Sequence, residues 1–239
     1  MELKDKKVVV VGFGRTGQAV CDFLLSQGAN ITVSDKKLES ELERVEIYRA
    51  KGINFDTGAN RLETLLEADL VVLSPGVPPL PEVLAAREKG IKVISEIELA
   101  FPYLRGKLIG ITGTNGKSTT TTLIYLMLKK AGFRVHLTGN IGHPLISFIN
   151  KVKPGHLVVT ELSSFQLEFT EKFRTDIAVF LNLSPNHLDW HQTFEAYLQA
   201  KKKLLDHCHP DDQVIINRDD PHLWAWRQEK RQELYAFSR

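Results

Sequence analysis

The chain has 239 residues, with 31 lysines and arginines against 29 aspartates and glutamates, so its formal net charge is +2. This near balance gives no sign of a nucleic-acid-binding surface, and a hydrophobic content of 43% argues against a disordered chain. Two domains are the better expectation, because single domains commonly hold about 100–200 residues. Cys21 and Cys208 are far apart and offer neither a disulfide framework nor a cysteine zinc site.

The amino-terminal segment and the hydropathy of the chain bear on its location. Residues 1–7 carry charges where a secretory signal needs an apolar run, and no apolar run approaches the ~18 residues that span a bilayer. We therefore expect a cytoplasmic protein without a membrane partner, and we take a monomer as the expected state.

Buried strands alternate with helical patterns along the chain, which predicts an α/β fold with parallel sheets. In the first series, strands are expected over 8–11, 31–33, 70–73 and 92–94, and helices over 18–27 and 81–89. The pattern breaks over 101–106, where we place a domain boundary.

A second series begins with an expected strand over 107–112. Its other strands are expected near 135–137, 157–162, 177–183, 214–217 and 234–237, and its helices over 118–131 and 194–205. A domain seldom ends on a strand without a covering helix, so we expect the second domain to be incomplete.

A first glycine loop, Gly12-Phe-Gly14-Arg-Thr-Gly17, follows the first expected strand and opens a helix, and Asp35 ends the second strand. This context is typical of a site for a nucleotide diphosphate, because glycines let the backbone approach phosphates and the helix N-terminus offers unpaired N–H groups. Glycines that only allow close packing of strand and helix remain the alternative. Arg15 adds a cation where an NAD site usually has none, which favours another nucleotide.

A second glycine loop, Gly113-Thr-Asn-Gly116-Lys117-Ser118-Thr119, lies between an expected strand and an expected helix. It predicts an ATP site, in which backbone N–H groups surround the phosphates, Lys117 meets the β and γ oxygens and the Ser118 hydroxyl ligates Mg²⁺. Ile111 occupies the usual first glycine position, so the loop is a compact variant. A chance Gly-Lys-Ser in a surface turn is the competing interpretation, and the flanking strand and helix count against it.

Polar residues follow three other strands at the same predicted sheet edge. Glu161 ends one strand and can hold Mg²⁺ directly or through water, although a solvated rim residue is an equal alternative without the loop beside it. His187 follows another strand and, because His is not a usual Mg²⁺ ligand, its chemistry favours proton transfer or substrate contact. Asn140 follows a third strand. The run Lys201–Lys203 would normally be a solvated helix face, and we keep that interpretation for Lys202 and Lys203.

Together these residues resemble the Mur ligases, ATP-dependent amide-forming enzymes of peptidoglycan synthesis. The matching segments lie in the family's order at 113–119, 139–142, 161–168, 182–189 and the Tyr197-x-x-x-Lys201 step. The 161–167 stretch, the first glycine loop and residues 74–78 are most similar to the family member that adds D-glutamate. Folylpolyglutamate synthases share the phosphate loop but lack the amino-terminal Rossmann-like domain.

The resemblance implies a Rossmann-like UDP-substrate domain over 1–104 and a P-loop-type ATP-binding α/β domain over 105–239, the second incomplete. It also implies ATP and two Mg²⁺ ions as cofactors. The substrates would be UDP-N-acetylmuramoyl-L-alanine and D-glutamate. Family members have a third, carboxyl-terminal domain, so we expect this chain alone to bind UDP ligands without catalysing ligation.

The resemblance also assigns residues to roles. Catalytic roles fall on Lys117, His187 and Lys201, and ATP binding on Gly113, Thr114, Asn115, Gly116, Lys117, Ser118 and Thr119. Substrate binding falls on Arg15, Thr16, Asp35, Lys36, Gly76, Asn140, Ser163 and Gln166. Metal binding falls on Ser118, Glu161, His187 and Lys201, the last as a carbamate formed with CO₂.

The implied reaction transfers the ATP γ-phosphoryl group to the substrate carboxylate, and the amine of D-glutamate then attacks the acyl phosphate.

Two other interpretations of the sequence stay open. A nicotinamide-dependent oxidoreductase would account for the first glycine loop and leave the second unexplained. A non-catalytic nucleotide-binding module would consist of these two domains alone.

Overall fold

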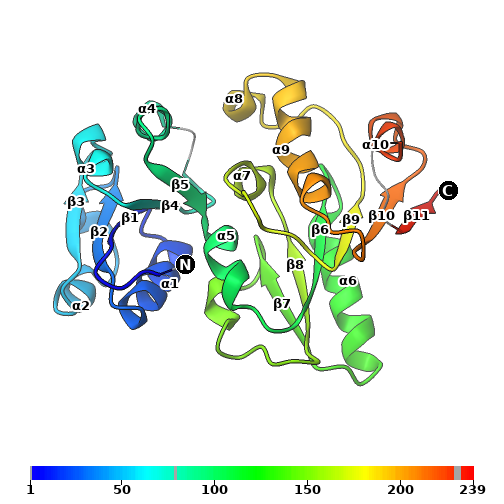
Figure 1. The fold of residues 1–239 in the computed structure, drawn as a ribbon, viewed down its shortest axis with the longest axis horizontal. Helices are drawn as coiled ribbons and strands as arrows, with labels where there is room; N and C mark the ends of the chain where they lie inside the picture. The colour runs from blue at the N-terminus through cyan, green and yellow to red at the C-terminus, as the bar shows by residue number, and fades with distance from the viewer. Residues whose placement is uncertain (1, 78–79, 229–232) are drawn as a thin grey trace. The chain divides into compact units, whose positions relative to one another are not determined.

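The computed structural model describes residues 2–77, 80–228 and 233–239 and divides the chain into two compact units, one ending at Pro102 and the other beginning at Tyr103. Pro78, which belongs to the 74–78 stretch used for the family resemblance, lies outside the described residues. Each unit is a parallel sheet with helices, as the alternating pattern predicted (Figure 1). Among the described helices, none is long and apolar enough to cross a membrane.

The first unit is a five-stranded sheet in the order β3-β2-β1-β4-β5. Its strands are β1 (Lys7–Val11), β2 (Asn30–Asp35), β3 (Asn54–Thr57), β4 (Leu70–Leu73) and β5 (Lys92–Ser95). Its helices are α1 (Arg15–Ser26), η1 (Glu39–Glu41), α2 (Val45–Arg49), α3 (Leu62–Leu66), α4 (Pro81–Glu88) and α5 (Glu96–Ala100), and η2 (Phe101–Tyr103) crosses the boundary. The strand order reverses between β1 and β4, the position where such sheets bind ligands.

The second unit is a six-stranded sheet in the order β11-β10-β9-β6-β8-β7. Its strands are β6 (Lys107–Thr112), β7 (Val135–Gly139), β8 (Leu157–Glu161), β9 (Ile177–Phe180), β10 (Gln213–Asn217) and β11 (Glu233–Phe237). Its helices are α6 (Lys117–Lys130), η3 (Leu145–Phe148), α7 (Ser164–Glu168), α8 (Leu188–His191), α9 (Phe194–Asp206) and α10 (Pro221–Trp226). The central position of β6 places the second glycine loop between the ends of β8 and β9.

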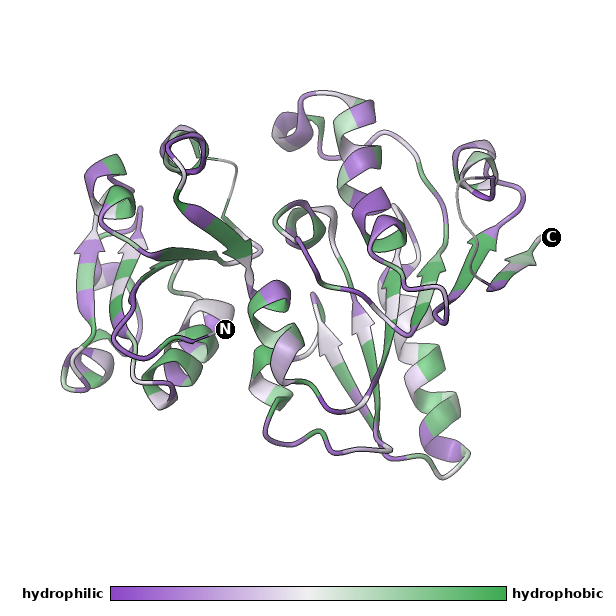
Figure 2. Cartoon of the chain, viewed as in Figure 1, coloured by the Kyte–Doolittle hydropathy of each residue, from purple (hydrophilic) through white to green (hydrophobic). Residues whose placement is uncertain are grey.

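Apolar residues of the central strands are buried, as expected for a parallel sheet with both faces covered. Figure 2 shows hydrophobic residues along strands of both sheets. On one face of the second sheet a buried cluster of Ile109, Ile111, Val159 and Val179 packs against α6. At about 25 cal/mol per Å² of apolar surface, burial of such side chains contributes roughly 1.5–3 kcal/mol each. This packing fixes the strand ends that carry the polar residues.

Most strand bounds shift by one or two residues, and two larger departures from the prediction have physical reasons. The strand predicted over 177–183 ends at Phe180, because Asn182 leaves the ladder and holds the neighbouring loop instead. The edge strand β3 was missed, since its sequence Asn-Phe-Asp-Thr lacks the apolar run that marks a central strand.

Candidate active site

The second glycine loop connects β6 to α6, and its backbone depends on two glycines. Gly116 has φ of +81°, and Gly113 has φ of +155° and lies against β9's continuation, where an added Cβ would come within 3.0 Å of Leu181. No side chain caps the N-terminus of α6. Its first-turn N–H groups are therefore available to an anionic ligand.

Asn182 fixes the loop from the strand that follows. Its backbone carbonyl accepts from the Thr114 N–H at 2.8 Å, and its side-chain oxygen accepts from the Asn115 N–H at 2.8 Å. Its amide group in turn donates to the Asn115 carbonyl at 3.0 Å. These three bonds hold the loop backbone against the segment that follows β9.

Thr114 links the loop to α9. Its hydroxyl is 2.8 Å from the Tyr197 hydroxyl and accepts from the Ser184 N–H at 3.0 Å. Tyr197 is buried, and burial raises the pKa of its phenol, so it stays neutral. Tyr197 was predicted only as part of a motif, and its contact with the loop arises from the fold.

Lys117 begins α6 and folds back over the loop. Its Nζ donates to the Thr114 carbonyl at 2.7 Å. Partial burial lowers the pKa of this amine, and the nearby Glu161 carboxylate opposes the shift. An amine in this position can leave the carbonyl for a phosphate oxygen, which is a stronger acceptor because it is charged.

Ser118, Glu161 and Asn140 form one hydrogen-bonded group at the ends of three elements. The Ser118 hydroxyl donates to Glu161 Oε2 at 2.7 Å, and the Asn140 amide donates to Glu161 Oε1 at 3.2 Å. Glu161 is buried while Ser118 is exposed, so the carboxylate lies behind a hydroxyl that solvent reaches. Within the described residues, no three His, Cys, Asp or Glu side chains gather as a metal site.

Lys201, on α9, lies under the same loop. Its ammonium is almost fully buried and donates to the Gly113 carbonyl at 2.9 Å and the Thr112 hydroxyl at 3.3 Å. Burial, and then the charge of Lys117, lower the pKa of Lys201 to about 7, while Glu161 acts in the other direction. The general interpretation of a lysine run as a solvated face is wrong for this residue.

The two lysines that follow differ from each other. Lys202 is partly buried and forms an ion pair with Asp206 one turn along α9, which agrees with a surface position. Lys203 instead donates to the backbone carbonyls of Glu168 and Thr170 at the end of α7. The prediction of a solvated side chain is wrong for Lys203, because the free carbonyls of a helix end attract a cation.

His187 lies apart from this group. It is exposed, has φ of +52°, and its ring packs against Phe165 with centroids 4.7 Å apart. Its described contacts do not include Glu161 or Ser118. The structure thus gathers Lys117, Ser118, Glu161 and Lys201 and leaves His187 on the rim.

Ser163 and Gln166 contact each other across the first turn of α7. The Ser163 hydroxyl and N–H both donate to the Gln166 side-chain oxygen, at 2.9 Å and 3.0 Å, and the Ser163 hydroxyl accepts from the Gln166 N–H at 3.3 Å. This capping box pairs backbone N–H groups that would otherwise be unpaired at the start of α7, a helix of five residues. Both side chains are buried, so they shape the sheet edge more than they reach into solvent.

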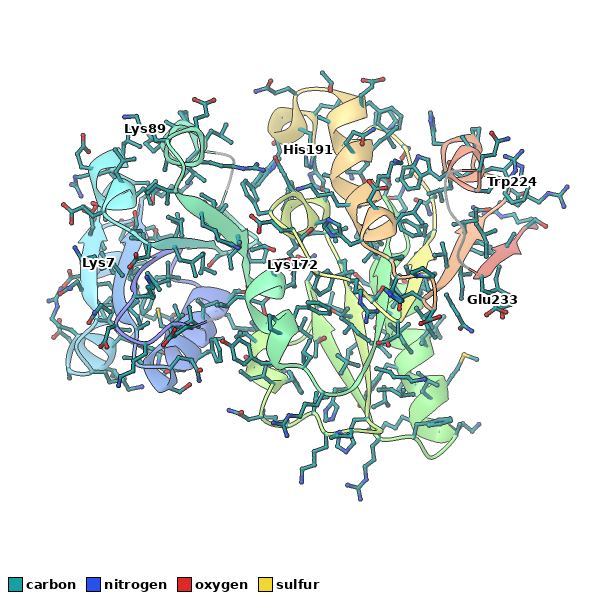
Figure 3. The ribbon with its side chains drawn as sticks, viewed as in Figure 1. Lys7, Lys89, Lys172, His191, Trp224 and Glu233 are labelled. Atoms are coloured by element: carbon teal, nitrogen blue, oxygen red, sulfur yellow. The ribbon has the colours of Figure 1, made fainter. Side chains whose placement is uncertain are left out.

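A buried histidine supports α7 from α8. Figure 3 labels this residue, His191. Its Nε2 is 2.9 Å from the Ser164 hydroxyl, and its Nδ1 is 3.7 Å from the Glu168 carboxylate. Burial first, and then the charge of Lys201, lower the pKa of His191 to about 4. The imidazole is therefore neutral near pH 7.

The first glycine loop is held by groups of its own unit. Gly12 has φ of +89°, and a Cβ at Gly17 would be 1.9 Å from the Gly12 carbonyl, so both positions need glycine. The Asp35 carboxylate accepts from the Phe13 and Lys37 N–H groups at 2.8 Å and 3.0 Å. Asp35 thus holds the loop, a role that the sequence analysis did not give it.

The other substrate residues predicted for the first unit lie at the same sheet edge as this loop. Arg15 is exposed and begins α1, whose N-terminus has no side-chain cap, and Thr16 follows it. Lys36 and Gly76 are exposed after β2 and β4. The Ser74 hydroxyl ties the β4 turn to the Gly12 carbonyl at 2.9 Å.

Two family descriptions match the chain. "Mur ligase MurD-like, N-terminal domain" matches residues 6–95, and "Mur ligase middle domain" matches residues 111–239. Curated relatives named UDP-N-acetylmuramoylalanine–D-glutamate ligase include one from Pelobacter propionicus at 42% identity and one from Koribacter versatilis at 44%. Both matches cover 100% of this chain and 54% and 53% of the relatives, so the chain spans about half of their length.

Solved structures with a similar fold are more distant in sequence. An UDP-N-acetylmuramate:L-alanyl-gamma-D-glutamyl-meso-diaminopimelate ligase from Neisseria meningitides matches with a TM-score of 0.60 and 17% identity over 97% of this chain and 78% of that one. An UDP-N-acetylmuramate-alanine ligase from Thermotoga maritima matches with a TM-score of 0.51 and 22% identity over 91% of this chain and 50% of that one. At these identities the likeness concerns the fold alone.

Proposed function

The chain belongs to the Mur ligase family, and from that premise we propose that it is part of an ATP-dependent ligase that joins D-glutamate to UDP-N-acetylmuramoyl-L-alanine. The observation that carries the proposal is the contact of Ser118 with Glu161 beside the phosphate loop, in a chain similar along its whole length to relatives of that name. Residues 1–104 would hold the UDP substrate and residues 105–239 the ATP. The site of action would be the cytoplasm.

The phosphate loop and its neighbours suit ATP with Mg²⁺. Mg²⁺ prefers oxygen ligands and keeps several waters, so one hydroxyl, one carboxylate and the phosphates suffice. Ser118 and Glu161 supply such oxygens, already 2.7 Å apart. Asn140 orients the carboxylate, and we propose that it also contacts the muramoyl part of the substrate, with Ser163 and Gln166 shaping that region. Mg²⁺ would neutralise the phosphate charge when bound.

We propose that Lys201 carries a carbamate in the active protein. Its amine donates hydrogen bonds only to neutral oxygens, the Thr112 hydroxyl and the Gly113 carbonyl. The positive charge of Lys117 disfavours a positive charge on Lys201. A neutral amine attacks CO₂ to form a C–N bond and releases one proton, giving an anion in place of a cation. That anion would face Lys117 and the metal region. His187, on the rim, would contact a second Mg²⁺ after ligands draw its loop inwards.

In the first unit, the uncapped start of α1 suits the diphosphate of a UDP group. Arg15 and Thr16 begin that helix, and Asp35 and Lys36 end the neighbouring strand. The match of residues 6–95 to a MurD-like domain disfavours the nicotinamide alternative.

The reaction then needs two balanced steps. A substrate carboxylate oxygen attacks the γ-phosphorus and ADP leaves, with Lys117 balancing charge on the transferred oxygens. The neutral amine of D-glutamate next attacks the acyl carbon, loses a proton, and phosphate leaves. The protein forms no covalent bond with the reactants in these steps. Most of the rate enhancement would therefore come from positioning the reactants and from neutralising the charge on the phosphates.

A ligand comparison tests the proposal. Calorimetric titration of the chain with UDP-N-acetylmuramoyl-L-alanine and with NADH should give heat of binding with the first and none with the second. Tighter binding of NADH would overturn the assignment of the first unit and restore the oxidoreductase interpretation.

A further inference from the structure

Helix α8 lies between two residues with uncommon backbone angles. His187 precedes it with φ of +52° and ψ of +39°, and Gln192 follows it with φ of +64° and ψ of −42°. A positive φ is uncommon for residues other than glycine and persists only where the surrounding contacts hold it. The contacts that hold this four-residue helix therefore decide where the His187 side chain lies.

Helix α7 contacts α8 at both of its ends. At the start, the Phe165 ring packs against the His187 ring, with centroids 4.7 Å apart. At the other end, the Ser164 hydroxyl is 2.9 Å from His191 Nε2. The two helices are thus joined along the whole length of α8.

Trp190 joins the middle of α8 to the same helix. Its Nε1 donates to Glu168 Oε2 at 2.9 Å, and its ring packs against Phe165 with centroids 4.0 Å apart. Phe165 and Glu168 are three residues apart in α7, so their side chains project from one face of that helix. A hydrogen bond to a carboxylate is stronger than one between neutral groups. Glu168 therefore makes the stronger of the two hydrogen bonds that join α7 to α8.

Outside α7, the described ring contacts and hydrogen bonds of α8 lead only to Tyr197 of α9. His191 meets the Tyr197 ring edge-on, with centroids 5.5 Å apart. Helix α7 also carries Ser163 and Gln166, the residues proposed to shape the substrate region. His187 and these two residues are therefore held as one group by the contact between α7 and α8.

On the basis of the proposed ligase function and of the role proposed there for His187, we propose that Glu168 is a positioning residue. By holding Trp190, it keeps α8 on α7 and keeps His187 in its left-handed backbone conformation. Glu168 contacts no reactant and acts through Trp190 and His187. Without its carboxylate, α8 detaches from α7, the backbone at His187 relaxes to negative φ, and the imidazole moves away from the substrate region.

Hydrogen exchange in the 239-residue chain tests the contact without any ligand. Three N–H groups donate to carbonyls at the start of α8, those of Trp190, His191 and Gln192. Glu168→Ala should raise their exchange rates about tenfold, because these bonds form only while α8 is folded. Glu168→Gln keeps an oxygen acceptor for the indole N–H and should give a smaller increase. Glu195→Ala, which removes an exposed carboxylate from the first turn of α9, is the control and should change nothing.

A double-mutant cycle in the full-length ligase tests whether Glu168 acts through His187. Glu168→Ala should lower kcat about tenfold, and Glu168→Gln should recover most of the loss. In a His187→Ala background, Glu168→Ala should cause no further loss, because the group that it positions is gone. Equal losses in the two backgrounds would overturn the positioning role, since a general structural support lowers activity whether His187 is present or not.

The outcomes separate this inference from the proposed function. An active ligase in which Glu168→Ala leaves the exchange rates of α8 unchanged would overturn the inference alone. An active ligase that His187→Ala leaves unaffected would also overturn it, because no positioned group would remain. A full-length protein without ligase activity would overturn the proposed function, and faster exchange in Glu168→Ala would then still show that Glu168 holds α8.

Discussion

The two glycine loops occupy equivalent places in the two sheets but differ in the residues around them. Each joins a central parallel strand to a helix whose N-terminus lacks a side-chain cap. In the first loop, the carboxylate of the nearby Asp35 accepts hydrogen bonds from backbone N–H groups and so holds the loop in place. In the second, Glu161 accepts from side chains that a cation can displace, and the half-buried Lys117 and the buried Lys201 lie nearby. We therefore expect both loops to bind an anion, and we expect the residues on the neighbouring strands to decide which chemistry follows.

Removal of Lys117 should have the largest effect and should separate the two loops. In the full-length protein, Lys117→Ala should reduce ATP-dependent phosphate release on the order of 1,000-fold, because the charge on the transferred group loses its nearest cation. Binding of UDP-N-acetylmuramoyl-L-alanine should stay unchanged by calorimetry. Lys130→Ala, at the exposed end of α6, is the control and should match the unmodified enzyme. An active Lys117→Ala protein would remove the second loop from the reaction.

Lys201→Ala should come next, with a loss of about 100-fold in ligase rate. If a carbamate is the functional group, acetate or formate should restore part of the rate by entering the space left behind. Lys202→Ala is the better control, since Lys203 supports the end of α7. Full activity without added carboxylate would show that Lys201 acts only as a buried support.

Acid should weaken the second unit through His191. The pKa of this histidine is lowered from 6.5 to about 4 in the folded chain, so the unfolded chain binds the extra proton first. The free energy of unfolding that depends on neutral His191 is fully present above pH 6.5. It decreases as the pH falls from 6.5 towards 4, by up to about 3 kcal/mol. Trp190, Trp224 and Trp226 are the chain's three tryptophans and all lie in the second unit, so their fluorescence reports its unfolding.

The matched variant for this test is His191→Gln, which cannot titrate. Its free energy of unfolding should depend less on pH between 4 and 6.5 than that of the unmodified chain. An unchanged slope would assign the acid sensitivity to other groups.

Arg15→Ala should have the smallest effect and should act on the first loop alone. Charge-assisted hydrogen bonds contribute about 1.5–3 kcal/mol, so UDP-ligand affinity should fall about tenfold or more. Lys51→Ala, which removes an exposed cation paired with Asp22 in the same unit, should leave affinity unchanged. Calorimetry that gives equal affinities for Arg15→Ala and the unmodified chain would contradict the role of Arg15.

Local patterns predicted the parts of the site that depend on neighbours in sequence. Both glycine loops and the place of Glu161 at a strand end follow from apolar runs broken by glycine or a polar residue. Asn182 could not be predicted as the residue that holds the second loop, because its partners are 67 residues away. The burial of Lys201 was equally hidden within a lysine run, and only the family resemblance singled it out.

The two lysines at positions 201 and 203 give α9 a mechanical role. Residues two apart on a helix point to different sides, so α9 reaches the loop after β6 with one side chain and the end of α7 with the other. A rigid helix held at both points transmits displacement from one to the other. Occupation of the nucleotide loop should therefore be felt at α7, 35 residues earlier in sequence than Lys203, as a change in its hydrogen-exchange rates.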